Sequence, residues 1–300
     1  MKEPVISVGM PVYNGEQYIS EALESILGQS IRDFELIISD NASTDSTPEI
    51  CRKYSRLDSR IVYIRQKRNI GGPRNWNFVF KQSRGKYFKW ASANDVCHPR
   101  MLEICKKVLD ERKDVVLSYP KTRMIDSKGI IGDKYEDGLD LQEDVAAKRF
   151  KKLLIKIDLN NAQNGLIRSK SLKRTALEGV YQNGDLTLMA ELALYGKFVE
   201  IPEFMFFRRV APGAVTSQRS GHERRIFNVP DFQGWLYLPM LQLYFDLFAA
   251  VFRSQINKRE KLDLYYFLGK KVNWDRRAIL EEFLHSLRFI GTRYAQNRLR

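Results

Sequence analysis

The first 120 residues alternate between short apolar segments and amphipathic segments, and this alternation constrains the fold more than any other feature. The amphipathic segments have helical periodicity; residues 19–27, for example, place their apolar side chains on one face of a helix. Such an alternation predicts a mostly parallel sheet with helices on both faces. The predicted strands are rich in Val and Ile, as buried strands are, and span residues 5–10, 35–40, 61–66, 87–92 and 115–120.

The pattern changes after residue 120. Residues 121–142 are polar and rich in Gly and Asp, which predicts a loop or a short hairpin. Residues 211–224 form a second break, after which the chain has helical periodicity and predicts a helical C-terminal extension. Between the two breaks the sequence predicts helices over 143–157 and 186–196, and strands over 163–168, 197–202 and 204–210.

The chain is strongly basic, with a formal net charge of +14. Residues 253–300 carry twelve Lys and Arg against five Asp and Glu, a net +7 that is half of the total. Such a charge indicates an anionic partner: nucleic acid, a phosphorylated substrate or a membrane surface. No RNP, helix-turn-helix or zinc pattern accompanies the basic residues, so we expect no nucleic-acid partner, although a nucleic-acid-binding protein stays an alternative.

The cysteines and the N-terminus predict a cytoplasmic protein. The three cysteines contain no CxxC pair, and Cys97–His98 lacks the partner pair that a zinc site needs. No apolar signal segment opens the chain. The apolar stretch 235–252 contains Asp246, which predicts a buried or interfacial helix rather than a membrane span. The apolar stripe over 279–294 fits either a helix packed on its own domain or one on a membrane surface.

Polar residues follow the first two predicted strands. Neither the GxGxxG pattern nor a P-loop is present after the first strand, which counts against a dehydrogenase. Pro11, Tyr13 and Asn14 instead offer an aromatic face and amide groups, which suit a base or a sugar ring, although a tight turn explains them equally well. Asp40 ends the second strand, where its carboxylate can accept a hydrogen bond from a base, whereas Asp45 is predicted to cap the next helix.

Four ordered blocks over residues 5–100 resemble the N-terminal part of the family 2 glycosyltransferases: ISVGMPVYNGEQYISEALESILGQS, FELIISDNASTDST, RNIGGPRNWN and GKYFKWASANDVCHP. A weaker resemblance continues through NGLIRSKSL and GDLTLMAELALYGKFVEIPEFMFFRRV. The resemblance implies an α/β, Rossmann-like GT-A fold over residues 1–224. Residues 1–120 would be the nucleotide-sugar-binding half and 121–224 the acceptor-side half, and 225–300 would be a helical basic C-terminal region.

The resemblance also implies roles for individual residues on the donor side. Pro11, Tyr13 and Asp40 would hold the nucleobase, usually uracil. The loop KRNIGGPRN would border the nucleotide, with Arg68 and Asn69 nearest to it.

The block ASAND would be the DxD-type site, where carboxylates bind Mn²⁺ or Mg²⁺ on the donor diphosphate. Here Ala93 and Asn94 precede Asp95, so one usual carboxylate is missing. We expect Asp95 to be the main metal ligand and Asn94 a neutral oxygen donor beside the nucleotide. Basic residues in place of the metal, and a degenerate inactive site, are the other two interpretations.

Asp185 matches the family's acceptor-side Asp and would be the general base of an inverting transfer; the alternative is an N-cap of helix 186–196. Arg208 and Arg209 could reach the diphosphate or form an ordinary solvated pair. The predicted enzyme moves a sugar from a nucleotide-diphospho-sugar, expected to be a UDP-sugar, to a glycan or lipid-linked acceptor in polysaccharide or glycoconjugate biosynthesis. Its basic C-terminal region would approach the inner face of an anionic membrane. A member that binds sugar nucleotides without catalysis is the alternative.

Overall fold

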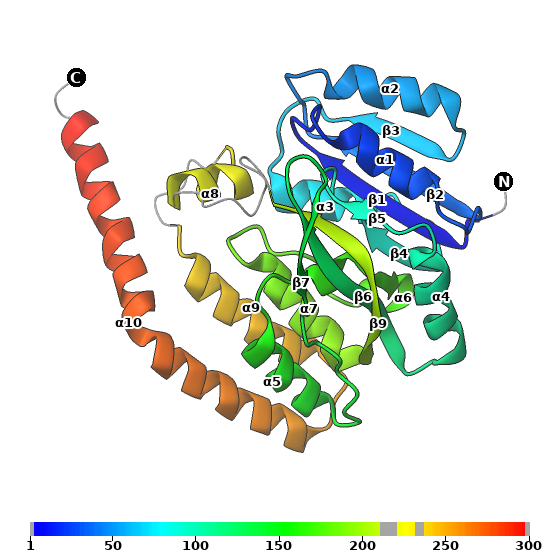
Figure 1. Ribbon diagram of the computed structural model, residues 1–300. Helices are drawn as coiled ribbons and strands as arrows, with labels where there is room; N and C mark the ends of the chain where they lie inside the picture. The colour runs from blue at the N-terminus through cyan, green and yellow to red at the C-terminus, as the bar shows by residue number, and fades with distance from the viewer. Residues whose placement is uncertain (1–2, 211–220, 232–236, 298–300) are drawn as a thin grey trace.

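One sheet runs through the molecule (Figure 1), and the computed structural model describes residues 3–210, 221–231 and 237–297. Within these residues the strand order is β3-β2-β1-β4-β8-β6-β9-β5, and β7 pairs with β6. The strands are β1 (Ile6–Val12), β2 (Phe34–Asp40), β3 (Ile61–Arg65), β4 (Tyr87–Trp90), β5 (Val96–Cys97), β6 (Val115–Ile125), β7 (Ile131–Tyr135), β8 (Leu166–Arg168) and β9 (Lys197–Arg209).

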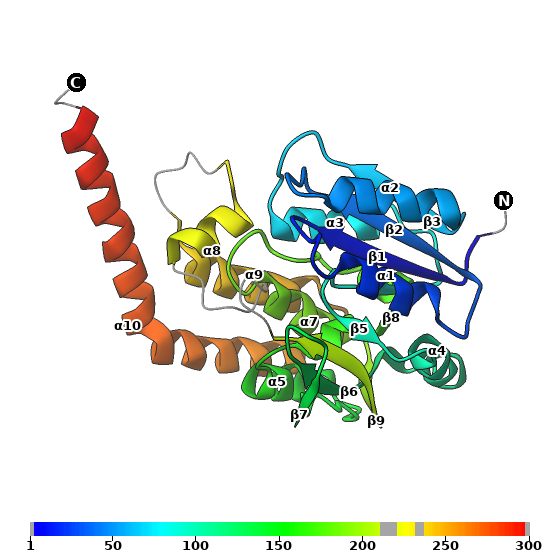
Figure 2. The same cartoon turned by 45° about the horizontal axis from the view of Figure 1, so that its top comes forward.

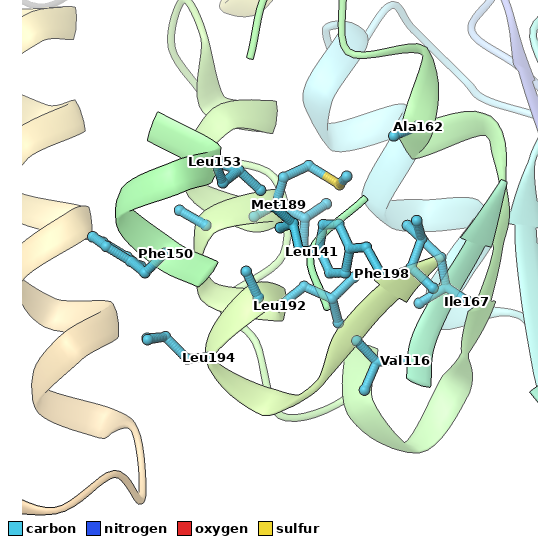
Figure 3. Packing of buried hydrophobic residues seen from close by; sticks show 14 of the residues in the cluster. Val116, Leu141, Phe150, Leu153, Ala162, Ile167, Met189, Leu192, Leu194 and Phe198 are labelled. Atoms are coloured by element: carbon cyan, nitrogen blue, oxygen red, sulfur yellow. The ribbon is translucent and has the colours of Figure 1, made fainter. Parts of the chain in front are cut away.

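Helices cover both faces of this sheet, as the sequence predicted. They are α1 (Ile19–Leu27), α2 (Thr47–Leu57), α3 (Gly72–Lys81), α4 (Met101–Glu111), α5 (Ala146–Lys156), the 3-10 helix η1 (Asn161–Asn164), α6 (Ser169–Leu172), α7 (Gly184–Tyr195), α8 (Gly221–Asn228), α9 (Pro239–Arg253) and α10 (Lys258–Asn297). Helices α1, α2 and α4 share one apolar core with β1 and β2. Helices α3, α5 and α7 share a second core with β6, β8 and β9 (Figure 3).

The N-terminal part of the sheet is parallel and matches the predicted strands closely. Strand β1 pairs with β2 on one side and with β4 on the other, and β2 pairs with β3. In this register Val12 lies opposite Asp40, and Asp40 opposite Arg65. Because parallel strands end at one edge, the loops after β1, β2 and β4 meet there, which is where open α/β sheets bind ligands.

The C-terminal part of the sheet is mixed. Strand β8 lies antiparallel between β4 and β6, and β6 forms the predicted hairpin with β7. The prediction of two separate strands over 197–202 and 204–210 is wrong, because both belong to β9. Pro120 pairs with Ile201 and Lys121 with Phe204, so the register shift skips Pro202, whose missing N–H cannot join the ladder.

The C-terminal helices pack on the second core. Tyr244, Leu247 and Val251 of α9 are buried, as are Leu264 and Leu268 of α10. Beyond this contact α10 runs away from the sheet in both views (Figures 1 and 2). In the described ranges no helix is both long and apolar enough to cross a membrane.

Two C-terminal predictions lie partly outside the described residues. Residues 221–224 of the predicted break belong to α8, and the rest of the break is not described. In the apolar stripe over 279–294, the side chains from Leu287 onward are likewise outside the description.

The three cysteines lie buried in the first core with free thiols. Cys51 comes from α2, Cys97 from β5 and Cys105 from α4. Burial is the main cause that raises the pKa of each thiol, to about 12 for Cys51 and Cys105. They therefore act as small apolar residues.

Gly165, between η1 and β8, provides a test of the packing beneath the site. A Cβ there would lie 2.5 Å from the Ser118 carbonyl oxygen and 2.6 Å from the Tyr119 Cβ, which cannot move without shifting β6. We expect Gly165→Ala to lower the free energy of unfolding by about 1–3 kcal/mol in urea titrations. The control is Gly269→Ala in α10, where the added Cβ meets no atom within 4 Å and a gain of up to about 1 kcal/mol is expected. Equal effects of the two substitutions would contradict the packing argument.

Candidate active site

Asp40 ends β2 as predicted, but its side chain is already engaged. It is 0% exposed. Its Oδ1 accepts the Ser43 N–H at 2.8 Å, and its Oδ2 accepts the Tyr63 hydroxyl at 2.8 Å. Arg65 adds a longer ion pair at 3.6 Å. Asp40 therefore orders the turn after β2, and a nucleobase would have to displace Tyr63 to reach it.

Of the three predicted residues at the end of β1, Pro11 and Asn14 are held by the fold, whereas Tyr13 is exposed. Pro11 is buried in the strand. Asn14 has a φ of +51° and joins two turns: its N–H donates to Ser43 Oγ, and its Oδ1 accepts the Thr44 N–H, both at 2.9 Å. Tyr13 keeps 49% of its surface exposed. Its ring is therefore the group of this turn that is best placed to stack on a base.

The loop before α3 reaches the same edge of the sheet. Asn69 Oδ1 accepts the Asn41 amide at 2.9 Å and the Gly71 N–H at 2.8 Å, so Asn69 fixes the loop to the end of β2. Arg68 is exposed and pairs with Asp231, which follows α8. The end of α8 covers Gly71 and Gly72. A Cβ on Gly71 would collide with Asn228, and a Cβ on Gly72 would collide with Phe227.

Asp95 and Asn94 lie between β4 and β5, against the end of β9. Asp95 Oδ1 accepts the backbone N–H of Arg209 at 2.8 Å, and Asn94 Oδ1 accepts the Ser92 hydroxyl at 2.5 Å. Asp95 is buried, and this burial raises the pKa of its carboxyl. The Arg209 N–H and the charges of Arg208 and Lys89 act in the opposite direction. These groups thus offset part of the cost of removing the carboxylate from water.

Two residues that act on Asp95, Arg209 and Lys89, have buried cationic side chains. Arg209 is 1% exposed, so it is not part of a solvated pair. Its guanidinium donates to Glu21 of α1, to the Asp126 carbonyl and to the Asn94 carbonyl, and it lies 4.5 Å from the Tyr18 ring centre. Lys89 of β4 is fully buried and donates to the Asn164 carbonyl. The sequence carried a signal for Lys89, because a lysine in an otherwise apolar strand requires a partner.

Asp185 lies in the first turn of α7, and Asn183 occupies the N-cap position in its place. Its Oδ2 accepts the Asn160 amide at 2.8 Å. Asn160 has a left-handed backbone, with a φ of +54°, and its amide also donates to Gln163 at 3.0 Å. The alternative of a simple helix cap is therefore not supported. Sequence reasoning missed Asn160, since nothing near it in the chain signals a contact with Asp185.

The end of β9 connects the segments that carry the two candidate carboxylates. The Arg209 N–H donates to Asp95, and Arg208 donates to the side chain of Asn161, the residue after Asn160. Asn160 in turn donates to Asp185. A chain of contacts thus joins Asp95 to Asp185, which are 90 positions apart in the sequence.

A second carboxyl group lies near Asp185. The backbone of Glu178 is clamped by Asn77 of α3, which accepts its N–H at 3.0 Å and donates to its carbonyl at 2.8 Å. Leu177 before it has a φ of +64°, a strained conformation for a residue with a side chain. Burial and, to a smaller extent, the charge of Asp185 raise the pKa of Glu178 well above its usual range. Glu178 therefore holds a proton more readily than an exposed glutamate does.

Asp137 is a buried carboxyl group that sequence reasoning missed. Its Oδ1 accepts the Asn161 N–H at 2.8 Å, whereas no described residue bonds to its Oδ2. Burial is the main cause that raises its pKa to about 6. The loop 121–142 offered no motif, so nothing in the sequence pointed to this residue.

A family model described as glycosyl transferase family 2 matches residues 7–174, more than half of the chain. The chain belongs to glycosyl transferase family 2. This confirms the family that the four motif blocks predicted. The match ends before α7, so Asp185 and the C-terminal helices lie outside it.

Among relatives of this family 2 chain, an uncharacterized glycosyltransferase of Methanocaldococcus jannaschii is 32% identical over 176 residues. These residues are 58% of this chain and 59% of that protein. Chondroitin synthase of Escherichia coli is 36% identical over 129 residues, 42% of this chain and 18% of that protein. The chain therefore spans less than two thirds of the length of either relative.

Solved structures confirm the GT-A architecture. S. aureus TarS in complex with UDP has a TM-score of 0.63 at 17% identity, over 91% of this chain and 73% of that chain. The mannosyltransferase PcManGT of Pyrobaculum calidifontis, in complex with GDP-Man and Mn²⁺, has a TM-score of 0.56 at 15% identity, over 99% of this chain and 81% of that chain. At these identities the likeness is one of fold.

The donor atoms near Asp95 fit a metal ion that takes most of its ligands from a substrate. Among the described residues, no group of three or more His, Cys, Asp or Glu side chains converges as a metal site. Asp95 already accepts one N–H, and the Asn94 amide oxygen accepts a hydroxyl. Mg²⁺ is commonly bound by one or two carboxylates together with substrate phosphates. A metal ion held by Asp95 would therefore need a substrate diphosphate to supply its other ligands.

Asp137→Asn tests the cost of burying the Asp137 carboxyl. Because its pKa rises from 3.8 to about 6 on folding, the folded protein binds a proton that the unfolded chain releases, and stability falls as pH rises between these values. Asparagine does not ionise and keeps an oxygen for the Asn161 N–H. We expect a gain in unfolding free energy on the order of 2 kcal/mol at neutral pH that vanishes near pH ~4. Urea titrations across this range measure it, with exposed Asp133→Asn as the control. A shift equal at every pH would refute the assignment.

Proposed function

We propose that this protein transfers a sugar from a nucleoside-diphospho-sugar to an acceptor hydroxyl, with inversion. The observation that carries the proposal is the link from Asp95 through Arg209 and Arg208 of β9, and through the pair Asn160–Asn161, to Asp185. It joins the carboxylate proposed for the diphosphate to the one proposed for the acceptor. Family membership supports the reaction class, and the residue roles below are part of the proposal.

The donor would lie over the ends of β1 and β2. The exposed ring of Tyr13 would stack on the base beside Pro11 and Asn14, and Asp40 would accept from it after exchanging its Tyr63 partner. Arg68 and Asn69 would border the nucleotide from the loop before α3. A UDP-sugar is our first expectation. Solved relatives of the same fold were crystallised with UDP, UDP-GlcNAc or GDP-Man.

Asp95, assisted by the Asn94 amide oxygen, would hold Mn²⁺ or Mg²⁺ together with the donor diphosphate. When bound, the metal ion would neutralise the charge that develops on the leaving diphosphate. The Arg209 backbone N–H and the charges of Arg208 and Lys89 offset part of the cost of burying Asp95.

Asp185 would take the proton of the acceptor hydroxyl while the hydroxyl oxygen attacks the anomeric carbon and the nucleoside diphosphate leaves. Asn160 donates to one carboxylate oxygen, Oδ2, so Oδ1 would be the oxygen that accepts the proton. Glu178 lies near this base, and burial and the charge of Asp185 are the two causes that raise the pKa of Glu178.

The cellular role belongs to the proposal as well. Polysaccharide or glycoconjugate biosynthesis at the inner face of a membrane agrees with the basic C-terminal helices and with relatives such as chondroitin synthase. A member that binds sugar nucleotides without transfer is the second candidate, because Ala93 and Asn94 stand where the family's motif usually has carboxylates.

Calorimetric titration with UDP, GDP and dTDP, with and without Mn²⁺, tests the donor site. We expect one nucleotide to bind and Mn²⁺ to tighten it about tenfold or more, because Asp95 and the diphosphate would both supply ligands to the ion. Asp95→Asn should abolish the effect of Mn²⁺, whereas Asp126→Asn, in the exposed turn after β6, should not. Binding that ignores Mn²⁺ would show that Asp95 holds no metal, and absence of binding would refute the donor site.

Asp185→Asn and Asn160→Gly test the acceptor side. We expect Asp185→Asn to lower kcat about 10²–10⁴-fold with the nucleotide Kd unchanged, because only the base is lost. Asn160→Gly should lower kcat about tenfold, since glycine keeps the left-handed backbone but removes the amide that orients Asp185. Asn183→Gly is the matched control, because Asn183 is also left-handed and makes no side-chain contact with Asp185. Full turnover in Asp185→Asn would exclude it as the base.

A further inference from the structure

A pocket opens between the loop before α7 and the start of α9, in the part of the chain beyond the family match. Its volume is about 560 Å³, within the range of ligand pockets. Its described lining includes Gly179, Tyr181, Tyr237, Gln242, Phe245 and Asp246.

The wall of this pocket lies against the turn that carries Asp185. Gly179 packs on Gly184, the residue before Asp185, with its N–H 3.4 Å from the Gly184 carbonyl oxygen. The Tyr181 hydroxyl lies 3.2 Å from Thr187 of α7 and donates to Asp246 at 2.6 Å. Asp185 is also among the charges that raise the pKa of Tyr181. A molecule in the pocket would therefore lie against the segment that leads into the proposed base.

The lining combines aromatic surface with a few fixed acceptors. The rings of Tyr181, Tyr237 and Phe245 border it, and Phe245 is 67% exposed. Gln242 donates to Asp246 at 3.1 Å, which holds that carboxylate in place. Rings that cover the apolar face of a molecule, together with amide and carboxylate groups that bind hydroxyls, suit a carbohydrate.

The charge of the described lining is the opposite of that of the whole chain. None of these lining residues is Lys or Arg, although the chain carries 50 of them, and Asp246 adds a negative charge. A phosphate or carboxylate group placed here would meet the Asp246 carboxylate and, among the described lining residues, no Lys or Arg, which is unfavourable at close range. The described lining therefore favours a neutral ligand over an anionic one.

We propose that this pocket is an acceptor subsite and that it takes a neutral sugar unit of a glycan. The proposal rests on the proposed glycosyl transfer, because it uses Asp185 as the neighbouring base. It narrows the acceptor to an uncharged glycan and assigns the choice of acceptor to α9.

Transfer to matched acceptors tests the proposal on the full chain. The probes are methyl glycosides of glucose, galactose and N-acetylglucosamine, each beside its 6-phosphate, with the sugar nucleotide that the protein hydrolyses as donor. We expect transfer to at least one neutral glycoside and a clear preference over its 6-phosphate. Transfer to the phosphates alone, or to none of the neutral glycosides, would overturn the proposal.

Two substitutions on α9 separate this pocket from its surroundings. Phe245→Ala should raise the acceptor KM about tenfold, because the ring would cover the bound sugar. The exposed ring packs on no core, so donor hydrolysis and the donor KM should stay unchanged. The control is Phe252→Ala, which removes a 73% exposed ring on the same helix outside the pocket and should change none of these values. An acceptor KM unaffected by Phe245→Ala would overturn the subsite.

The two proposals fail in different ways. If no sugar nucleotide is bound or hydrolysed, the proposed glycosyl transfer is wrong. If the donor is bound and hydrolysed but acceptor use ignores Phe245 or favours phosphates, only the acceptor subsite is wrong.

Discussion

The candidate site depends on the burial of a single guanidinium group, that of Arg209. It draws together α1 through Glu21, the β6–β7 turn through the Asp126 carbonyl, and the loop after β4 through the Asn94 carbonyl. A buried cation is tolerated only when acceptors surround it, so these segments must be in place before Arg209 can be buried. A helix and a hairpin with no chemical role of their own therefore fix the loop that carries Asp95.

Strand β9 also sets the relation between the two candidate carboxylates. Neighbouring residues of a strand point to opposite faces. Arg209 turns toward α1 and the Asp95 loop, and Arg208 turns toward Asn161 at the start of η1. Because both belong to one continuous strand, the position of Asp95 is tied to that of the segment that orients Asp185.

Much of the fold was predictable from sequence because its first half obeys local rules. Strands β1 to β4 are apolar runs bounded by turn residues, and Asp95 and Asp185 belong to recognisable motif blocks. That β9 is one continuous strand was not predictable, because Pro202 indicates the end of a strand unless the register shift against β6 is known.

The contacts that orient the site were not predictable either. The Asn160–Asp185 hydrogen bond spans 25 residues and depends on how η1 packs, and Arg68 meets Asp231 from a distant segment. The burial of Asp40 likewise depends on Tyr63, which β3 brings beside it. Such pairings arise from tertiary packing, which leaves no local pattern in the sequence.

The distribution of the cysteines has a practical consequence for following the folding of this chain. All three lie in the core beneath α1, α2 and α4, whereas the core shared by α5, α7 and α9 contains none. A thiol reagent can modify them only after that first core opens, since a buried thiol of high pKa does not react. The labelling rate therefore measures the opening of the first core and does not report on the second. Compared with a probe on the second core, it would reveal whether the two open as one cooperative unit.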